Sequence, residues 1–390
     1  MESRYLKGIK KICRASETEA EKLVYGTDAS RIKGQTILVA WPENAEQLQR
    51  LIRFVTREKI SMTIRGGGTS LVGSAVPQNA VVVDMALFSR IKKIDLNKET
   101  ATVEAGIVLD ELNNLLKNYE YEFSSQPGSH AACTIGGMIA TNAAGMLTLR
   151  HGRVIDQVLE ISIIDGTGKS FTIKGDEIKD FAGTEGSVAI ILDAKLKINR
   201  KKELFDAVYE FDNITELLAK IDELKNNAEV EALEYINKIA AKIAGIGSKD
   251  YLLVKYSSPR GNIDKQKANE IWKLRENMYS VLVEAGFQRI EDPFIPEESI
   301  GKFILWLQEK NIPAYGHVSC GILHPHFRRS QRDLNDFMEV VKQLKGKLAA
   351  EHGIGILKKN IDMIFGQIKR IRDLKEKYDP FNILNRGKFK

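Results

Sequence analysis

The heptapeptide Arg65-Gly66-Gly67-Gly68-Thr69-Ser70-Leu71 follows a predicted strand at residues 61 to 64, and it decides how the rest of the chain is interpreted. Three successive glycines expose consecutive backbone N–H groups, and a concave run of such groups binds phosphate oxygens. The heptapeptide lacks the Gly-Lys-Ser/Thr of a P-loop and the G-x-G-x-x-G of a dinucleotide fingerprint. Taken alone, it is either a phosphate-binding loop or an ordinary tight turn.

Two further segments are rich in small residues. The first covers residues 126 to 145, within a stretch from 123 to 149 that contains no Asp, Glu, Lys or Arg. The second is Phe181-Ala182-Gly183-Thr184-Glu185-Gly186-Ser187. Fifteen of the 30 glycines fall between Gly66 and Gly186, and clustered glycine lets the backbone approach a large ligand closely. Each segment alone is also typical of a buried packing loop, and Glu185 alone is more typical of a carboxylate that stabilises a turn.

The pattern around these segments mixes helix and strand. Apolar residues at i, i+3, i+4 and i+7 predict a helix over residues 44 to 59. A long predicted strand at residues 188 to 198 is followed by the polar run Asn199-Arg200-Lys201-Lys202-Glu203, beyond which glycine becomes sparse. Strands and helices then continue, and they include a long helix at residues 265 to 284. We therefore expect an α+β chain of two domains, residues 1–198 and 199–390.

Composition excludes several classes of protein. With 28% charged and 43% hydrophobic residues, the 390-residue chain has the composition of an ordinary globular protein, and it contains no apolar stretch that could span a membrane. Its three cysteines lie far apart, which excludes a disulfide framework and an iron–sulfur cluster within the chain. The first residues lack the apolar stretch of a secretory signal, so we expect a cytoplasmic protein, with peripheral membrane contact left open.

The net charge of +6 arises within residues 331–390, where 14 Lys and Arg stand against 8 Asp and Glu. Interleaved aromatic residues and a nucleic-acid-binding motif are both missing, so we do not expect a nucleic-acid partner. Two explanations remain open. The excess is either a solvated basic helix face or a docking surface for an acidic partner or anionic ligand.

In this order, the three glycine segments resemble those of the FAD-binding domain of the vanillyl-alcohol oxidase superfamily, over about residues 24–198. The resemblance implies a PCMH-type FAD-binding domain with two subdomains, in which the first segment, including Arg65, cradles the pyrophosphate. It implies that the ribityl chain and flavin ring are lined by Pro127, Gly128, Ser129, Thr134, Gly136, Gly137, Thr141, Asn142 and Gly145. Glu185, Gly186 and Ile190 would lie near the adenosine end. Relatives with covalent flavin use a histidine where this chain has Thr69, so we expect non-covalent FAD.

Four of the six histidines fall in two late segments, residues 315 to 326 and Glu351-His352. Neutral imidazoles and one carboxylate make a divalent metal site with an open coordination position. His317 and His324 are seven residues apart, so a hairpin or two facing strand positions would bring both to one ion. From residue type alone, hydrogen-bonded structural histidines are the commoner alternative.

These late segments resemble the FAD-linked oxidase C-terminal domain of the D-2-hydroxyacid dehydrogenases, a family that includes glycolate, D-lactate and D-2-hydroxyglutarate dehydrogenases. The matching segments are GHVSCGILH, EHGIG and DPFNILNRGK. The resemblance implies an α+β cap domain with a divalent metal, Zn with Mn or Fe as alternatives, bound by His317, His324 and Glu351. His352 would be the catalytic base and Asn385 would lie near the flavin. Residues 319 to 322 read Ser-Cys-Gly-Ile instead of the family's Gly-Asp-Gly-Asn, which leaves the substrate open.

Residues 271 to 276 are similar to the family's W-x-x-R-E helix, which implies that Arg275 binds the substrate carboxylate through a two-donor fork. The resemblance as a whole implies an FAD-dependent dehydrogenase that oxidises a D-2-hydroxy acid to the 2-oxo acid. Because the chain has no relay of its own, electrons would pass to a separate quinone, flavoprotein or iron–sulfur subunit. Two alternatives stay open, a sugar or aldonolactone oxidase of the same superfamily and a non-catalytic flavin-binding subunit of a larger redox complex.

Overall fold

The computed structural model describes residues 3–328, 331–361 and 365–389, and the chain forms two compact units. Each unit is assembled from separated stretches. The first comprises residues 1–143, 153–201 and 351–390, and the second comprises residues 144–152 and 202–350. This differs from the consecutive division at residue 198 that we expected, because the stretch after residue 350 packs within the first unit.

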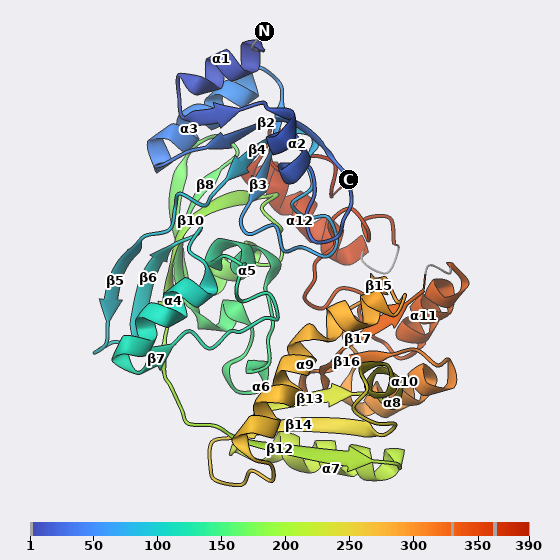
Figure 1. Cartoon of the computed structure of the whole chain (residues 1–390). Helices are drawn as coiled ribbons and strands as arrows, with labels where there is room; N and C mark the ends of the chain where they lie inside the picture. The colour runs from blue at the N-terminus through green and yellow to red at the C-terminus, as the bar shows by residue number, and fades with distance from the viewer. Residues whose placement is uncertain (1–2, 329–330, 362–364, 390) are drawn as a thin grey trace. The chain divides into compact units, whose positions relative to one another are not determined.

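A four-stranded sheet in the first unit contains the strand that precedes the Arg65 loop. Its order is β1-β2-β4-β3, with β2, β4 and β3 parallel and β1 antiparallel (Figure 1). The bounds are β1 Arg14–Ser16, β2 Gln35–Trp41, β3 Ser61–Arg65 and β4 Gln78–Asp84. Helix α3 (Ala45–Arg57) confirms the helix predicted at residues 44 to 59, and it buries Leu48, Leu51 and Val55 in the same core as Val81 and Val83 of β4.

The free side of β3 is extended by a segment from far along the chain. The Met62 N–H donates to the Ile383 carbonyl at 2.8 Å, and the Asn385 N–H donates to the Met62 carbonyl at 2.8 Å. Residues 383 to 385 therefore continue the hydrogen bonding of the sheet beside the strand that carries the first glycine segment.

A second sheet of the first unit is antiparallel, with the order β5-β6-β10-β8-β9. The bounds are β5 Ile91–Asp95, β6 Thr100–Glu104, β8 Val158–Asp165, β9 Ser170–Lys174 and β10 Ala189–Lys197, and β7 (Tyr121–Glu122) pairs with β11 (Asn199–Arg200). The α-helices are α1 Arg4–Lys10, α2 Glu19–Tyr25, α4 Leu109–Leu116, α5 Ile135–Thr141 and α12 Phe365–Tyr378, and 3-10 turns cover Lys117–Tyr119, Val154–Gln157 and Gly175–Asp180. The two sheets are the two subdomains that we expected.

The second unit is built on a six-stranded antiparallel sheet with the order β12-β14-β13-β16-β17-β15 (Figure 1). The strands are β12 Phe205–Phe211, β13 Val230–Ile236, β14 Asp250–Tyr256, β15 Arg289–Ile290, β16 Ala314–His317 and β17 Ile322–Phe327. The helices are α6 Thr148–His151, α7 Ile214–Asn226, α8 Lys238–Ala244, α9 Lys265–Glu284, α10 Glu297–Glu309 and α11 Gln331–Gln343, with a 3-10 turn at Val318–Cys320. Trp272 and Leu282 of α9 pack with Leu253 of β14 in the core of this α+β unit.

Part of the basic excess after residue 331 lies inside the first unit. Lys358 and Lys388 are buried, and the Lys375 ammonium donates to the Ser187 carbonyl at 2.8 Å and to Asp379 at 2.5 Å. Such cations hold segments of the fold together, so they belong neither to a solvated helix face nor to a docking surface. Among the described residues, no helix is both long and apolar enough to cross a membrane.

Candidate metal centre and flavin site

The hairpin of β16 and β17 brings two predicted metal ligands together. In its register His317 faces Ile322, and Tyr315 faces His324. Side chains that face each other across a pair of strands share one side of the sheet, and side chains two residues apart on a strand also share it. His317 and His324 therefore lie diagonally on the same side, with ring centroids 5.8 Å apart. The hairpin that the spacing allowed is confirmed.

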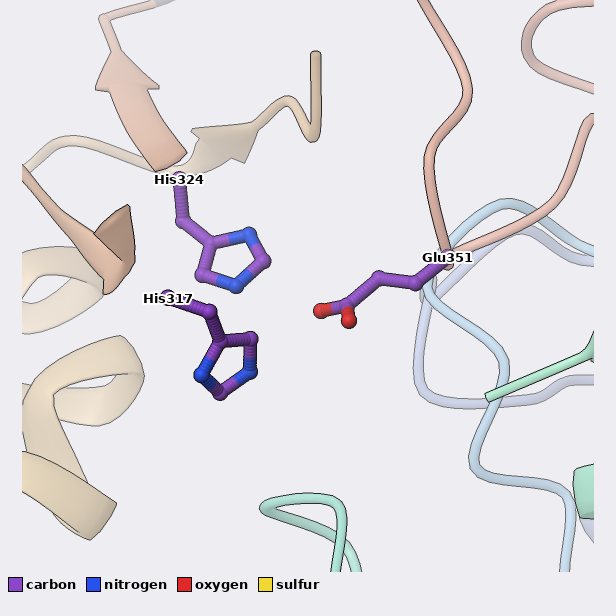
Figure 2. Close-up of side chains that lie close together, drawn as sticks. All are labelled: His317, His324 and Glu351. Carbon is purple, nitrogen blue, oxygen red and sulfur yellow. The ribbon is translucent and has the colours of Figure 1, made fainter. Parts of the chain in front are cut away.

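Glu351 supplies the carboxylate of the group. It follows Ala350, whose N–H donates to the main-chain and side-chain oxygens of Asp292 at 3.0 Å each. One ligand atom from each of His317, His324 and Glu351 lies within 4.8 Å of the others, and Figure 2 shows the carboxylate directed toward the two rings. Two imidazoles and one carboxylate match the ligand set of a zinc site that keeps a coordination position open. The residues fit the expected divalent metal.

A buried carboxylate that the sequence analysis missed lies behind His317. Glu234 of β13 accepts a hydrogen bond from His317 Nδ1 on Oε1, while Arg275 donates to Oε2 from Nε at 2.8 Å and from Nη2 at 2.5 Å. Burial raises the pKa of Glu234, but the charges and hydrogen bonds of Arg275 and His317 outweigh burial and bring it to about 2. An ionised carboxylate only accepts hydrogen bonds, so Nδ1 of His317 carries a proton, and in the neutral ring Nε2 is then the nitrogen with the lone pair.

Arg275 is therefore placed differently from our expectation. The two-donor fork predicted to hold the substrate carboxylate is engaged with Glu234, and the guanidinium carbon lies 4.6 Å from the centre of the Tyr315 ring. Within the described ranges, no acceptor takes a hydrogen bond from Nη1 of Arg275. From this position, Nη1 is the nitrogen that Arg275 has left for a hydrogen bond to a substrate.

The other histidines of the late segments have separate roles. His352 places Nε2 3.6 Å from Oε1 of Glu351, and its side chain is 13% exposed. His326 is buried, and its Nδ1 donates to the Phe287 carbonyl at 3.1 Å. His352 thus adjoins the carboxylate of the candidate metal ligand Glu351, whereas His326 has the hydrogen-bonded structural role that residue type alone had left open.

In the first unit, the first glycine segment packs against the second. A Cβ atom on Gly66 would collide with the Thr134 hydroxyl, and one on Gly67 would collide with the Ala132 carbonyl. Thr134 caps helix α5 by accepting a hydrogen bond from the Gly137 N–H at 3.3 Å. These glycines are therefore required by the close approach of two chain segments, in addition to any contact with a ligand.

The first segment has the hydrogen-bonding capacity that a diphosphate needs. Across the residues that the structure describes, no acceptor receives a hydrogen bond from the backbone N–H groups of residues 66 to 71. Arg65 holds the loop from behind, because its Nη1 donates to the Thr27 carbonyl at 2.6 Å. A Cβ atom on Gly128 would meet nothing within 4 Å, so the backbone of the second segment is open there. The residues fit the expected cofactor.

Through Glu185, the third segment contacts the second segment, the chain just after the first segment and residues 354–355. The Glu185 N–H donates to the Ala140 carbonyl at 2.8 Å, and its buried carboxylate accepts from Ser74 Oγ at 2.5 Å, the Ile354 N–H at 2.6 Å and the Gly355 N–H at 3.0 Å. The carboxylate of Glu185 therefore links segments 111 to 170 residues away from it, which differs from the local turn-stabilising role that the sequence had left as an alternative. Its expected place near the adenosine stays a prediction.

Two residues of the C-terminal motif complete this buried network. Asn385 donates from Nδ2 to the Glu185 carbonyl at 2.5 Å, and Lys388 donates to the Asn385 side chain at 3.1 Å and to the Ser74 carbonyl. Burial lowers the pKa of Lys388, and the Glu185 and Asp28 carboxylates oppose that shift. Lys388 lies in the C-terminal motif DPFNILNRGK, from which no role was expected for it. The lysine in this C-terminal motif was the sequence feature that could have indicated its role.

Other residues that were predicted to contact FAD, at its flavin or its adenosine end, have structural partners. Ile190 of β10 pairs with Ile164 and lies in the hydrophobic core, and Asn142 ends α5 with a positive φ of 51°. Gly145 belongs to the stretch 144–152 of the second unit, and its N–H donates to Thr148 Oγ1 at 2.8 Å. The Thr141 hydroxyl donates to the Gly137 carbonyl at 3.1 Å.

Comparison with known proteins gives two family matches and a set of relatives. Residues 36–174 match the model of an FAD binding domain, and residues 223–389 match that of the C-terminal domain of FAD linked oxidases. The chain is 25% identical to the D-lactate dehydrogenase of Archaeoglobus fulgidus, over 91% of each chain. It is 23% identical to a mitochondrial D-2-hydroxyglutarate dehydrogenase of Arabidopsis thaliana, over 91% of this chain and 75% of the relative. It is 24% identical to the glycolate oxidase subunit GlcD of Bacillus subtilis, over 95% of this chain and 93% of the relative.

A solved structure shares the fold. Alkyldihydroxyacetonephosphate synthase aligns with a TM-score of 0.74 and 14% identity, over 99% of this chain and 85% of that chain. Together with the two domain matches, this similarity confirms the expected fold, an FAD-binding domain followed by an α+β C-terminal domain.

Proposed function

Because this chain belongs to the FAD-linked oxidases, we propose that it is an FAD-dependent dehydrogenase of a D-2-hydroxy acid, assisted by a divalent metal. The observation that carries the metal proposal is the convergence of ligand atoms of His317, His324 and Glu351 within 4.8 Å. The substrate class is proposed from the relatives, which are named for D-lactate, D-2-hydroxyglutarate and glycolate.

The cofactor proposal rests on the first unit. The six N–H groups of residues 66 to 71 would bind the pyrophosphate of FAD, and the open backbone at Gly128 would face the flavin part of the cofactor. Thr69 offers no imidazole for a covalent link, so we expect FAD to dissociate on denaturation. Bound FAD supplies the hydride acceptor of the reaction, and a bound divalent metal acidifies the substrate hydroxyl.

The protein's own residues account for the remaining chemistry. His352 would take the hydroxyl proton on its imidazole while the hydrogen on C2 leaves as a hydride to the bound flavin, so the substrate would lose one proton and one hydride and become the 2-oxo acid. Arg275 offers Nη1 to the substrate carboxylate while its fork stays on Glu234. We propose that the two electrons leave to a separate acceptor, a quinone, a flavoprotein or an iron–sulfur subunit.

The proposal is tested by the visible spectrum of the purified protein during anaerobic addition of D-lactate, glycolate and D-2-hydroxyglutarate in turn, with L-lactate as the control. We expect the flavin bands to bleach with one of the first three and to persist with L-lactate. Flavin that none of the three bleaches would contradict the substrate class, and a chain that binds no FAD on reconstitution would contradict the cofactor.

Metal analysis separates the proposal from its nearest alternative. A sugar or aldonolactone oxidase of this fold does not require the group of His317, His324 and Glu351, whereas the proposed enzyme does. We expect about one divalent metal per chain in elemental analysis of protein purified without chelator. A fully active protein without metal would favour the alternative.

A further inference from the structure

The carboxylate behind the metal-binding hairpin has a defined geometry. Glu234 shares its two oxygens between two partners, Oε1 with Nδ1 of His317 and Oε2 with Nε and Nη2 of Arg275. Its side chain is 1% exposed, and those of His317 and Arg275 are 10% and 12% exposed. Water therefore competes weakly for these hydrogen bonds.

An imidazole that binds a metal through one nitrogen donates from the other to a carboxylate or carbonyl, and this hydrogen bond fixes the ring's tautomer and orientation. In His317 the nitrogen turned away from Glu234 is Nε2. Glu234, held in a buried pair with Arg275, faces Nδ1 of His317, so the neutral ring that this hydrogen bond favours is the tautomer in which Nε2 presents a lone pair.

We propose that Glu234 is a positioning residue that holds His317 in its metal-binding tautomer, and that Arg275 keeps Glu234 in place by a two-donor ion pair. The inference rests on the proposed metal site and adds to it two residues that do not contact the ion. Arg275 also balances the buried charge of Glu234, because an uncompensated carboxylate at this depth is strongly destabilising.

The same strand supplies a matched control. Glu231 of β13 is 2% exposed, and like Glu234 it has a cation and an imidazole as neighbours, Lys202 at 2.7 Å and His151 at 3.8 Å. Neither of those partners belongs to the group of candidate metal ligands. Glu231→Gln therefore removes an equally buried charge from β13 without touching His317.

The experiment measures zinc affinity of the full-length apoprotein by competition with a chromogenic chelator, for the wild type, Glu234→Gln and Glu231→Gln. In a glutamine at position 234 an NH2 donor replaces one of the two carboxylate oxygens, so either His317 Nδ1 or the Arg275 fork loses its acceptor. We expect Glu234→Gln to weaken zinc binding on the order of 10- to 100-fold and Glu231→Gln to leave it within about twofold. Far-ultraviolet circular dichroism and the thermal midpoint establish that each variant is folded.

The variant Arg275→Lys tests the same role of Glu234 if Glu234→Gln does not fold. Arg275→Lys keeps the positive charge but loses the two-donor fork, so we expect zinc binding to weaken by a smaller factor, about 3- to 10-fold. In the cobalt(II) form, the visible d–d bands should shift in Glu234→Gln and remain unchanged in Glu231→Gln.

The outcomes distinguish this inference from the proposed function. A wild-type chain that binds no zinc would overturn the metal site itself. Wild-type binding that Glu234→Gln matches, or that Arg275→Lys matches where the first variant is unfolded, would overturn only the role of Glu234. Equal weakening by Glu234→Gln and Glu231→Gln would also overturn that role, because it would show a general effect of removing charge from β13.

Discussion

The carboxylate of Glu185 accepts a hydrogen bond of 2.6 Å from the backbone N–H of Ile354, although 169 residues separate the two. Gly355 donates to the same carboxylate, and a Cβ atom on Gly353 would collide with it. One buried side chain therefore fixes the path of the segment that follows Glu351 and His352, inside the first unit.

Replacing Glu185 by alanine should strongly destabilise the first unit. The change leaves the Ser74 hydroxyl and the Ile354 and Gly355 amides without their acceptor, and it removes one of the two carboxylates that favour the charged form of buried Lys388. We expect the free energy of unfolding, measured by urea titration, to fall by about 3 to 5 kcal/mol. Glu111→Ala, on the exposed side of α4, should change it by less than about 0.5 kcal/mol. A loss for Glu185→Ala as small as this control would refute the anchoring role.

Lys388→Met should make stability depend on pH through Glu185. Burial raises the pKa of Glu185, and Lys388 is among the groups that restrain this rise. Above the pKa of the unfolded carboxyl, near 4.5, the folded state of the variant keeps a proton that the unfolded state has released, so the free energy of unfolding falls as pH rises. We expect the variant to lose more stability than the wild type between pH 5 and pH 8.

The double variant Lys388→Met with Glu185→Gln provides the control for this pH effect, because it contains neither ionisable group. Its unfolding free energy should lack the additional slope between pH 5 and pH 8. If the single variant is no more pH-dependent than the wild type, the two buried groups are not electrostatically linked in the way that the network implies.

His352→Ala should slow turnover while flavin stays bound. The imidazole adjoins Glu351 and is our candidate base, and loss of a general base typically costs about 10²- to 10⁴-fold in rate. Steady-state assays with an artificial electron acceptor give the rate, and the flavin spectrum reports the cofactor content. Unchanged kcat in the folded variant would remove His352 from the mechanism.

Removal of the metal should inactivate the enzyme reversibly. Dialysis against a strong chelator, followed by addition of zinc, manganese or iron(II) in separate samples, identifies the ion that restores activity. His317→Ala should bind metal more weakly than the wild type, because it leaves two of the three candidate protein ligands. Full activity in metal-free protein would rule out metal assistance.

Cys320 should be the first thiol to react with iodoacetamide in the folded protein. Cys13 and Cys133 are buried, and burial raises the pKa of each thiol to about 11, so both are protonated and shielded at pH 8. Cys320 is half-buried. Peptide mass spectrometry after short labelling gives the order. Labelling of Cys133 ahead of Cys320 would show that the second glycine segment opens readily.

The sequence predicted features that depend on short-range pattern. The periodicity of Leu48, Leu51 and Val55 predicted α3, and the spacing of His317 and His324 allowed the hairpin that brings them together. The resemblance to a known family added the expected roles of the three glycine segments and of the Glu351 carboxylate. The helix periodicity and the histidine spacing depend only on residues close together in the sequence. The motif roles depend on the chemistry of a few residue types.

Contacts between distant segments were not predictable from the pattern. Glu234 lies in a strand of which every residue is buried, and a charged side chain there was a visible anomaly. Its partners, Arg275 and His317, lie 41 and 83 residues away, and no spacing rule links them. In the same way, the place of residues 351–390 in the first unit depends on hydrogen bonds such as that of Glu185 with Ile354.

The bridge between Met62 and Leu384 has a consequence for synthesis of the chain. A ribosome that has just made β3 must add about 320 more residues before the segment that borders this strand exists. At 5 to 20 residues per second, this takes roughly 15 to 60 seconds, during which the edge of β3 stays unpaired and open to other chains. The glycine loop that follows β3 thus gains its full support late in translation, and prematurely terminated chains should be unable to retain the nucleotide.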